Sequence, residues 1–278
     1  MSDLRPLPSQ MIGELVGAAL SEDWGRLGDI TSAAVIEPNA NARGVIRARE
    51  EGVLAGLGFA QTAFTLTDKR LQLDMHAADG GNLSAGTDVM TITGPAIALL
   101  SAERVALNFL GHMSGIASQT AQLNALVAHT SARICDTRKT TPGLRAVEKY
   151  AVRAGGGFNH RFGLDDAILI KDNHIAIAGG VAPAIARAQA NVGHMMRIEV
   201  EVDTLDQLDE ALAAGADILL LDNMPPETLK EAVARIDGHA VSEASGRVDA
   251  ASVTAIAEAG VDYISVGRIT HSAPCLDL

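Results

Sequence analysis

The chain has 278 residues, of which 47% are hydrophobic and only 3% aromatic, and its formal net charge is −12. This length fits one large domain or two ordinary ones. The negative charge disfavours binding to nucleic acid or to an anionic membrane, and the few aromatic side chains leave little for base stacking or for anchoring at a membrane interface.

The N-terminal segment lacks the features of a secretion signal. Residues 1–20 have no basic region ahead of their apolar residues, and Glu14 interrupts the apolar run. No apolar stretch reaches the roughly 18 residues that span a bilayer. The two cysteines, Cys135 and Cys275, form no CxxC motif and no disulfide framework. We therefore expect a cytoplasmic protein that does not enter the membrane.

The first hundred residues predict a small domain that mixes helices and strands. Apolar residues recur at helical spacing over residues 9–20 and near residues 55–66, whereas alternating or β-branched residues predict strands. The predicted strands are residues 43–49, 71–77 and 88–94. A long helical pattern over residues 101–130 connects this region to the second half of the chain.

The second half alternates short apolar segments with helical patterns. The predicted strands lie in residues 133–137, 167–172, 197–202, 217–222, 239–245 and 263–267, and the clearest helices in residues 204–215, 225–238 and 249–260. Alternating strands and helices with short loops indicate βαβ units and a parallel sheet. A repeat of about 20 to 24 residues favours a β/α barrel, with an open doubly wound sheet as the alternative.

Polar residues gather at the carboxyl ends of these predicted strands, where a β/α barrel builds its active site. In residues 197–202 the alternation places Glu199, Glu201 and Asp203 on one face, directed into the barrel. Buried carboxylates need a cation, water or a salt bridge. A bound cation and salt bridges across the barrel both remain open for Glu199 and Asp203.

The segment from Arg133 to Arg161 is basic, with seven Lys or Arg residues and two Asp or Glu residues. Arg138, Lys139 and Arg161 fall on the predicted rim, so we expect them to bind an anionic ligand.

Two further features of this segment have a structural alternative. Arg145, Lys149 and Arg153 stand at near-helical spacing and are interpreted as a solvent-exposed helix face. The three glycines at 155–157 fit either a flexible turn or a close approach of the backbone to a ligand.

Two later loops are typical of phosphate binding. Residues 245–247 (Ser-Gly-Arg) precede a helix, and residues 266–268 (Val-Gly-Arg) follow the last strand. Barrels commonly bind phosphate in such loops through backbone N–H groups. Together with Glu201 and Asp222, these loops predict a phosphorylated ligand that brings Mg²⁺.

The basic segment also carries a long motif. Residues 136–175, DTRKTTPGLRAVEKYAVRAGGGFNHRFGLDDAILIKDNHI, closely resemble the signature of quinolinate phosphoribosyltransferases, also called nicotinate-nucleotide pyrophosphorylases (carboxylating). The resemblance covers nearly the whole chain in order, through residues 19–32, 102–117, 198–208, 219–224, 243–246 and 260–272.

The resemblance implies a fold of two domains and an activity. Residues 1–106 would form an N-terminal α/β open sandwich onto which residues 271–278 pack back, and residues 107–270 an incomplete β/α (TIM-like) barrel. The enzyme would transfer the phosphoribosyl group of phosphoribosyl pyrophosphate (PRPP) to quinolinate with decarboxylation. Its products would be nicotinate mononucleotide, CO₂ and pyrophosphate, as in NAD biosynthesis, with Mg²⁺ brought by PRPP and no organic cofactor.

The resemblance also implies roles for individual residues. Arg138, His160 and Arg161 would line the quinolinate pocket, with Arg104 reaching it from the other subunit of a homodimer or higher oligomer. Lys139, Lys171, Glu201 and Asp222 would be catalytic, and the two carboxylates would serve the ribose and Mg²⁺. The full set of expected substrate-binding residues is Arg104, Thr137, Arg138, Lys139, His160, Arg161, Lys171, Glu201, Asp222, Ser245, Gly246, Arg247, Val266, Gly267 and Arg268.

Arg247 and Arg268 depart from the family pattern, which has smaller or uncharged residues there. Two alternative functions are a barrel lyase that forms a Schiff base at Lys171 and a paralogue associated with molybdenum transport. Schiff-base chemistry does not call for the arginines at 104, 138 and 161. The paralogue departs from the KTTPGLR motif found here.

Overall fold

The computed structural model describes residues 4–278 and contains two compact units. Among the described residues, unit 1 comprises residues 4–121, 146–156 and 272–278, and unit 2 comprises residues 122–145 and 157–271. The boundary that the sequence placed between residues 106 and 107 stays a prediction. No helix within residues 4–278 is long and apolar enough to cross a membrane.

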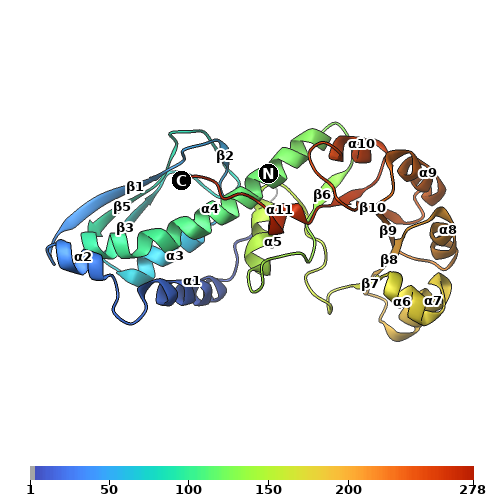
Figure 1. The fold of residues 1–278 in the computed structure, drawn as a ribbon, viewed down its shortest axis with the longest axis horizontal. Coiled ribbons are helices and arrows are strands. Elements are labelled where there is room, and N and C mark those ends of the chain that lie inside the picture. Colours follow the sequence, from blue (N-terminus) through green and yellow to red (C-terminus); the bar gives the residue numbers. More distant parts are fainter. Residues whose placement is uncertain (1–3) are drawn as a thin grey trace. The chain divides into compact units, whose positions relative to one another are not determined.

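Unit 1 is built on an antiparallel sheet in the order β1 (Asn41–Arg47), β5 (Asp88–Pro95), β3 (Gln72–Met75), with a short pair formed by β2 (Gly52–Val53) and β4 (Asn82–Leu83). Figure 1 shows its helices, which are α1 (Ser9–Trp24), α2 (Ile30–Val35), α3 (Leu57–Thr67), α5 (Arg145–Ala154) and most of α4 (Ala96–Val127). Phe59 of α3 stacks on Phe109 of α4 with ring centroids 4.8 Å apart. The predicted mixture of helices and strands is confirmed.

The C-terminal segment belongs to unit 1. The backbone N–H of Leu276 donates to the carbonyl oxygen of Gly111 at 2.9 Å, and the N–H of Arg49 donates to the carbonyl oxygen of Asp277 at 3.0 Å. These bonds attach the last residues to α4 and to the end of β1.

Helix α5 corrects one prediction from the sequence. Lys149 is 3% exposed and Glu148 is fully buried, so the helix face does not point to solvent. Arg145 and Arg153 are half-buried. Glu148 Oε1 lies 3.1 Å from Nε2 of His112 on α4, which gives this buried carboxylate a polar partner. The spacing of charges along α5 resembles an exposed face, but Glu148 and Lys149 on it are buried in the folded protein.

The glycines after α5 serve packing. A Cβ atom at Gly155 would collide with the carbonyl oxygen of Ala117 and the side chain of Thr120, both on α4. Gly156 has φ +80°, a conformation that glycine adopts without steric cost. Gly155 therefore permits a close approach between the segment that follows α5 and helix α4, and not an approach to a ligand.

Unit 2 is a six-stranded parallel sheet in the order β6-β11-β10-β9-β8-β7. The strands are β6 (Arg133–Cys135), β7 (Ile168–Ile170), β8 (Ile198–Val202), β9 (Ile218–Asp222), β10 (Val241–Ser245) and β11 (Tyr263–Ser265). All six lie within the predicted segments. Among residues 4–278 the edge strands β6 and β7 do not pair with each other, so the sheet curves without closing. The predicted incomplete barrel is confirmed.

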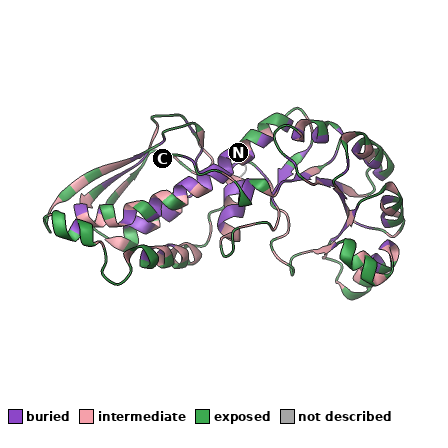
Figure 2. Ribbon diagram, viewed as in Figure 1, coloured by how far each residue is buried: buried purple, intermediate pink, exposed green. Residues whose placement is uncertain are grey.

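Helices cover the convex face of this sheet (Figure 1). They are α7 (Val181–Asn191), α8 (Leu205–Ala213), α9 (Pro226–Ile236) and α10 (Val253–Glu258), with α6 (Asp172–Ala178) and α11 (Arg268–His271) following β7 and β11. Thr204 caps α8, because its side chain accepts from the N–H of Gln207. In Figure 2 the strands are largely buried, whereas the outer faces of these helices are exposed.

The strand register decides which side chains face the inside of the barrel. Glu201 on β8 is level with Leu220 on β9, which is level with Glu243 on β10, and Asp222 is level with Ser245. Level residues on neighbouring strands point to the same face. The alternate residues, such as Val200, are buried on the side of the helices. This alternation brings polar residues from several strands into one interior.

Candidate active site

A cavity of about 930 Å³ opens at the carboxyl ends of the strands of unit 2. This is the end of a β/α barrel at which active sites are built. The lining residues are Thr137, Arg138, Lys139, His160, Arg161, Leu169, Lys171, Glu201, Leu220, Asp222, Asn223, Glu243, Ser245, Gly246, Arg247, Val248, Asp249, Ser265, Gly267, Arg268 and His271.

The cavity thus brings together all but two of the expected substrate-binding residues. Val266 does not line it, because its side chain is 2% exposed and its N–H donates to the carbonyl oxygen of Cys135 at 2.9 Å. Val266 therefore offers neither a side chain nor its N–H to a ligand. Arg104 lies on α4 in unit 1, where it is exposed.

Two arginines in the cavity have buried nitrogen atoms without a partner. Nε of Arg138 and Nε of Arg161 are buried and make no hydrogen bond within residues 4–278. Burial, and then the positive charge of Arg138, lower the pKa of Arg161. One Nη atom of Arg161 donates to the carbonyl oxygen of Ala167 at 2.8 Å, which fixes the direction of the guanidinium group. Unpaired buried donors on two neighbouring cations are suited to a ligand with carboxylate groups.

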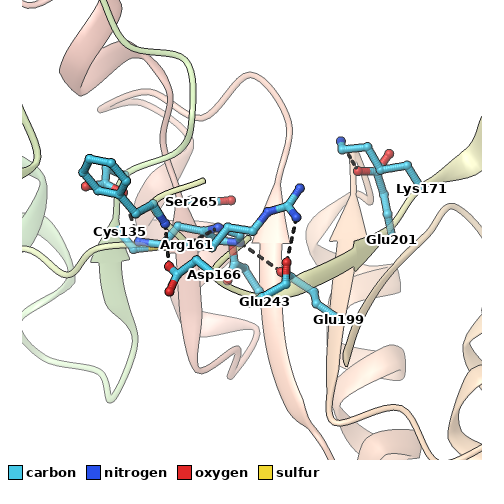
Figure 3. A network of polar contacts seen from close by, with 12 residues as sticks. Cys135, Arg161, Asp166, Lys171, Glu199, Glu201, Glu243 and Ser265 are labelled. Carbon is cyan, nitrogen blue, oxygen red and sulfur yellow. Dashed lines mark hydrogen bonds and ion pairs between the residues drawn. The ribbon is translucent and has the colours of Figure 1, made fainter. Parts of the chain in front are cut away.

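A second cation is paired with a carboxylate. Nζ of Lys171, at the end of β7, lies 2.7 Å from Oε2 of Glu201 on β8, and Figure 3 shows this pair apart from the group around Glu199 and Glu243. The side chain of Glu201 is 14% exposed and that of Lys171 is 45% exposed. Lysines that form Schiff bases are activated by an apolar pocket or by a neighbouring cation, whereas Lys171 faces a carboxylate.

His160 and Glu243, which line the cavity, form a cluster with the buried Glu199. Nε2 of His160 lies 3.0 Å from Oε2 of Glu199 and 3.6 Å from Oε1 of Glu243. Nδ1 of His160 accepts the N–H of Arg161 at 2.8 Å, so the ring proton is on Nε2 and points to the carboxylates. The three groups are close enough to hold a metal ion, with ligand atoms within 4.8 Å of one another. The protonated Nε2 argues against that use.

The two buried glutamates influence each other. Burial and the nearby Glu199 raise the pKa of Glu243 to about 7, and His160 acts in the opposite direction. The thiol of Cys135 also contacts Glu243, with Sγ 3.9 Å from Oε1. Glu243 is 6% exposed. At neutral pH a substantial fraction of this carboxyl group therefore carries a proton.

The carboxylate of Asp222 is held by two neighbours. Oδ1 accepts the hydroxyl of Ser245 and Oδ2 accepts the side-chain amide of Asn223. Each oxygen retains a lone pair. Glu201 likewise has one oxygen, Oε1, that no hydrogen bond within residues 4–278 uses. Carboxylate oxygens on adjacent strands suit Mg²⁺ when a phosphate group supplies further oxygen ligands, so these residues fit a magnesium ion that arrives with a phosphorylated ligand.

Four further polar residues line the cavity that the sequence motifs did not predict: Asn223, Glu243, Asp249 and His271. His271 could have been placed near the cavity from its position in the chain, four residues after Gly267. His271 follows Gly267 by one helical turn, and its N–H donates to the carbonyl oxygen of Gly267 at 3.2 Å. Asn223 and Glu243 were visible only as polar residues at strand ends.

Comparisons with known proteins agree with this architecture. The model of the quinolinate phosphoribosyl transferase N-terminal domain matches residues 29–114, and the model of the C-terminal domain matches residues 116–278. A Bacillus subtilis protein named "Probable nicotinate-nucleotide pyrophosphorylase [carboxylating]" is 46% identical over 92% of this chain and 88% of its own length. The Mycobacterium leprae nicotinate-nucleotide pyrophosphorylase [carboxylating] is 42% identical over 95% of both chains.

The fold matches solved structures equally well. The nicotinate-nucleotide pyrophosphorylase from Francisella tularensis superposes with a TM-score of 0.95 at 40% identity, covering 100% of this chain and 98% of that one. The enzyme of the same name from Ehrlichia chaffeensis gives a TM-score of 0.91 at 40% identity over 95% and 96% of the two chains. On sequence and structure alike, the chain belongs to the quinolinate phosphoribosyltransferase family.

Proposed function

We propose that the protein transfers the phosphoribosyl group of PRPP to quinolinate and releases CO₂ and pyrophosphate, producing nicotinate mononucleotide for NAD biosynthesis. The observation that carries the proposal is the pair of buried, unpartnered guanidinium nitrogens of Arg138 and Arg161. They lie in one cavity with the two lysines and two carboxylates that this reaction requires. Family membership supports the same reaction.

The two substrates repel each other, because quinolinate carries two carboxylates and PRPP carries phosphate and diphosphate. Arg138 and Arg161 bind the quinolinate carboxylates, and His160 lies beside them at the floor. Lys139 and Lys171 face the diphosphate. Cations on several strand ends therefore offset the repulsion that would otherwise keep the two anions apart.

The residues at the PRPP end have separate tasks. The loops that contain Gly246 and Gly267 hold the 5′-phosphate through backbone N–H groups. Glu201 and Asp222 face the ribose, where positive charge develops at C1 as pyrophosphate leaves, and their negative charge stabilises that state. Bound Mg²⁺ would neutralise charge on the diphosphate. Lys171, held by Glu201, remains a fixed cation for the leaving group.

Decarboxylation follows from ring attachment. Attack of the pyridine nitrogen on C1 makes the ring cationic, and the ring can then accept the electron pair of the breaking bond between C2 and the carboxylate. Arg138 and Arg161 hold the ring by its carboxylates while this bond breaks, so their role is orientation. The carbon at C2 finally takes up a proton.

The alternative of a Schiff base at Lys171 is disfavoured by the ion pair with Glu201 at 2.7 Å, because a Schiff-base lysine is activated by an apolar pocket or a neighbouring cation and not by a carboxylate. Borohydride reduction in the presence of a carbonyl substrate should leave no adduct at Lys171. The relatives described above carry pyrophosphorylase names, which favours phosphoribosyl transfer over a role in molybdenum transport.

The use of Mg²⁺, the cytoplasmic location and a dimeric state remain proposals. For the dimer, Arg104 is exposed on α4 of unit 1 and does not line the cavity of unit 2, which fits a role in the site of a partner subunit. Mixing inactive Arg104→Ala protein with inactive Lys139→Ala protein tests this directly. Hybrid dimers would contain one intact site, so activity should return on mixing, whereas an Arg104 that acts within its own chain gives no recovery.

The proposed reaction is tested by measuring both products with purified protein, quinolinate, PRPP and Mg²⁺. CO₂ and nicotinate mononucleotide should appear in equal amounts, and Lys139→Ala should abolish both. Lys230→Ala is the matched control, because Lys230 is half exposed on α9, pairs with Glu227 and does not line the cavity. Turnover of nicotinate without CO₂, or no turnover by folded protein, would refute the proposal.

A further inference from the structure

Two of the three non-glycine residues with a left-handed backbone within residues 4–278 line the cavity. They are Asn223 (φ +53°) and Arg247 (φ +44°), whereas the third, Asp237 (φ +43°), ends α9 away from it. This conformation is unfavourable for side chains with a Cβ atom, although asparagine tolerates it better than most. Glycine would adopt it without that cost. The turn alone therefore does not explain why an asparagine, and not a glycine, stands at position 223.

The amide of Asn223 binds the carboxylate that faces the ribose in the proposed function. Nδ2 of Asn223 donates to Oδ2 of Asp222, and the hydroxyl of Ser245 donates to Oδ1. Each oxygen of Asp222 thus receives one donor, from the loop after β9 and from the end of β10. Rotation of the carboxylate about either side-chain torsion would break at least one of these bonds.

The backbone fixes the amide in turn. The N–H of Asn223 donates to the carbonyl oxygen of Ser245 at 3.0 Å, which ties the end of β9 to the end of β10. Gly246 follows with φ +102°, and a Cβ atom there would collide with Oδ1 of Asn223. The asparagine side chain lies directly against the backbone of the neighbouring loop, and only a glycine at 246 leaves room for it.

Asn223 could act as a turn residue or as a residue that orients Asp222, and the two roles need different chemical groups. A turn residue needs only the left-handed backbone and the N–H bond to Ser245, which glycine supplies as well. A residue that orients Asp222 needs the amide donor, which glycine and aspartate both lack. A held carboxylate keeps its remaining lone pairs in one direction, and such outer contacts commonly decide how well a functional group works.

We propose that Asn223 is a positioning residue that holds the Asp222 carboxylate in its working orientation, with Gly246 as the space into which the amide fits. The inference rests on the proposed function, in which Asp222 faces the ribose of PRPP.

Three variants of the full-length protein test it: Asn223→Gly, Asn223→Asp and, as the control, Asp237→Gly. Both positions have nearly the same φ, and Asp237 is exposed at the end of α9 and does not line the cavity. Asn223→Gly should keep the wild-type melting temperature or exceed it, yet lose about 10- to 100-fold in kcat/KM for PRPP, the range found for outer contacts of functional groups. The KM for quinolinate should stay unchanged. Asn223→Asp keeps the shape but removes the donor, so it should lose at least as much, whereas Asp237→Gly should match wild type.

A second readout does not depend on turnover. Crystal structures of wild type and Asn223→Gly should show Asp222 in one orientation in the first and displaced or in several orientations in the second. Calorimetry with PRPP and Mg²⁺, without quinolinate, should show weaker binding to Asn223→Gly. Wild-type-like kcat/KM for PRPP with Asp222 unmoved in Asn223→Gly overturns the inference, as does an equal loss in Asp237→Gly. If wild type itself fails to convert quinolinate, the proposed function fails, and the Asp222 orientation still decides the inference.

Discussion

Replacing Glu243 by glutamine should make the protein more stable at alkaline pH. Glu243 lies on β10 at the floor of the cavity and is 6% exposed. Its neighbour Glu199 has one oxygen, Oε1, that is buried without a hydrogen-bond partner in the described chain. Two ionised carboxylates in this position are costly, because burial removes them from water and their like charges repel each other.

The size of the effect follows from the pKa of Glu243, which burial and Glu199 raise from 4.5 to about 7. Below pH 4.5 the group is protonated in the folded and unfolded states alike, so it costs nothing. As the pH rises from 4.5 to 7, the unfolded chain releases the proton first and the folded state loses stability. At about 1.4 kcal/mol for each pKa unit, the full loss is about 3 kcal/mol and is complete above pH 7.

Glutamine is uncharged at every pH and avoids this loss. Glu243→Gln and wild type should melt at similar temperatures at pH 5. At pH 8 the variant should melt higher by roughly 6 °C or more, since 1 kcal/mol corresponds to about 2 to 4 °C in a protein of this size. Differential scanning calorimetry at pH 5, 6, 7 and 8 measures the gap. Glu227→Gln is the control, because that carboxylate is 86% exposed and its variant should follow wild type at every pH. A gap that is constant with pH, or a variant that is less stable at pH 8, refutes the reasoning.

Two further predictions concern the packing of Gly155 against α4 and the positive charges of Arg247 and Arg268. Gly155→Ala should destabilise unit 1 by about 1 to 3 kcal/mol, because the added methyl group meets the carbonyl oxygen of Ala117; thermal melting measures this, and Gly193→Ala, where a Cβ meets nothing within 4 Å, should be nearly neutral. Arg247→Ala and Arg268→Ala should each raise the KM for PRPP by about 10-fold and weaken its dependence on salt, as expected when a cation that faces an anionic ligand is removed. Steady-state kinetics at two salt concentrations checks this, and an unchanged KM contradicts it.

The local pattern of apolar and polar residues was sufficient to predict the helices and strands and most of the residues that line the cavity. Strands such as β8 and β9 are short runs of β-branched or aliphatic residues, and strand formation follows from that composition and its alternation. Once the strands are known to be parallel, their carboxyl ends meet at one edge. Lys171, Glu201 and Asp222 could therefore be placed in one site from sequence spacing alone.

Contacts between distant segments could not be inferred in this way. Lys149 stands at the spacing of an exposed helix face, yet it is 3% exposed in the folded protein. Gly155 was compatible with a ligand contact, yet the backbone that it admits belongs to α4. Val266 sits in a glycine-containing loop, but its N–H is taken by Cys135 of the neighbouring strand β6.

By itself the amino-acid sequence determined the parallel αβ architecture, the family and the set of charged residues at the strand ends, because these depend on local periodicity and on a long motif. Tertiary structure alone decided the chemical state of those residues. The pairing of Lys171 with Glu201 and the raised pKa of Glu243 beside Glu199 arise from side chains on different strands, and the carboxylate of Asp222 is held by its neighbour Asn223 and by Ser245 at the end of β10. Their energies depend on distance and burial, which exist only after the chain has folded.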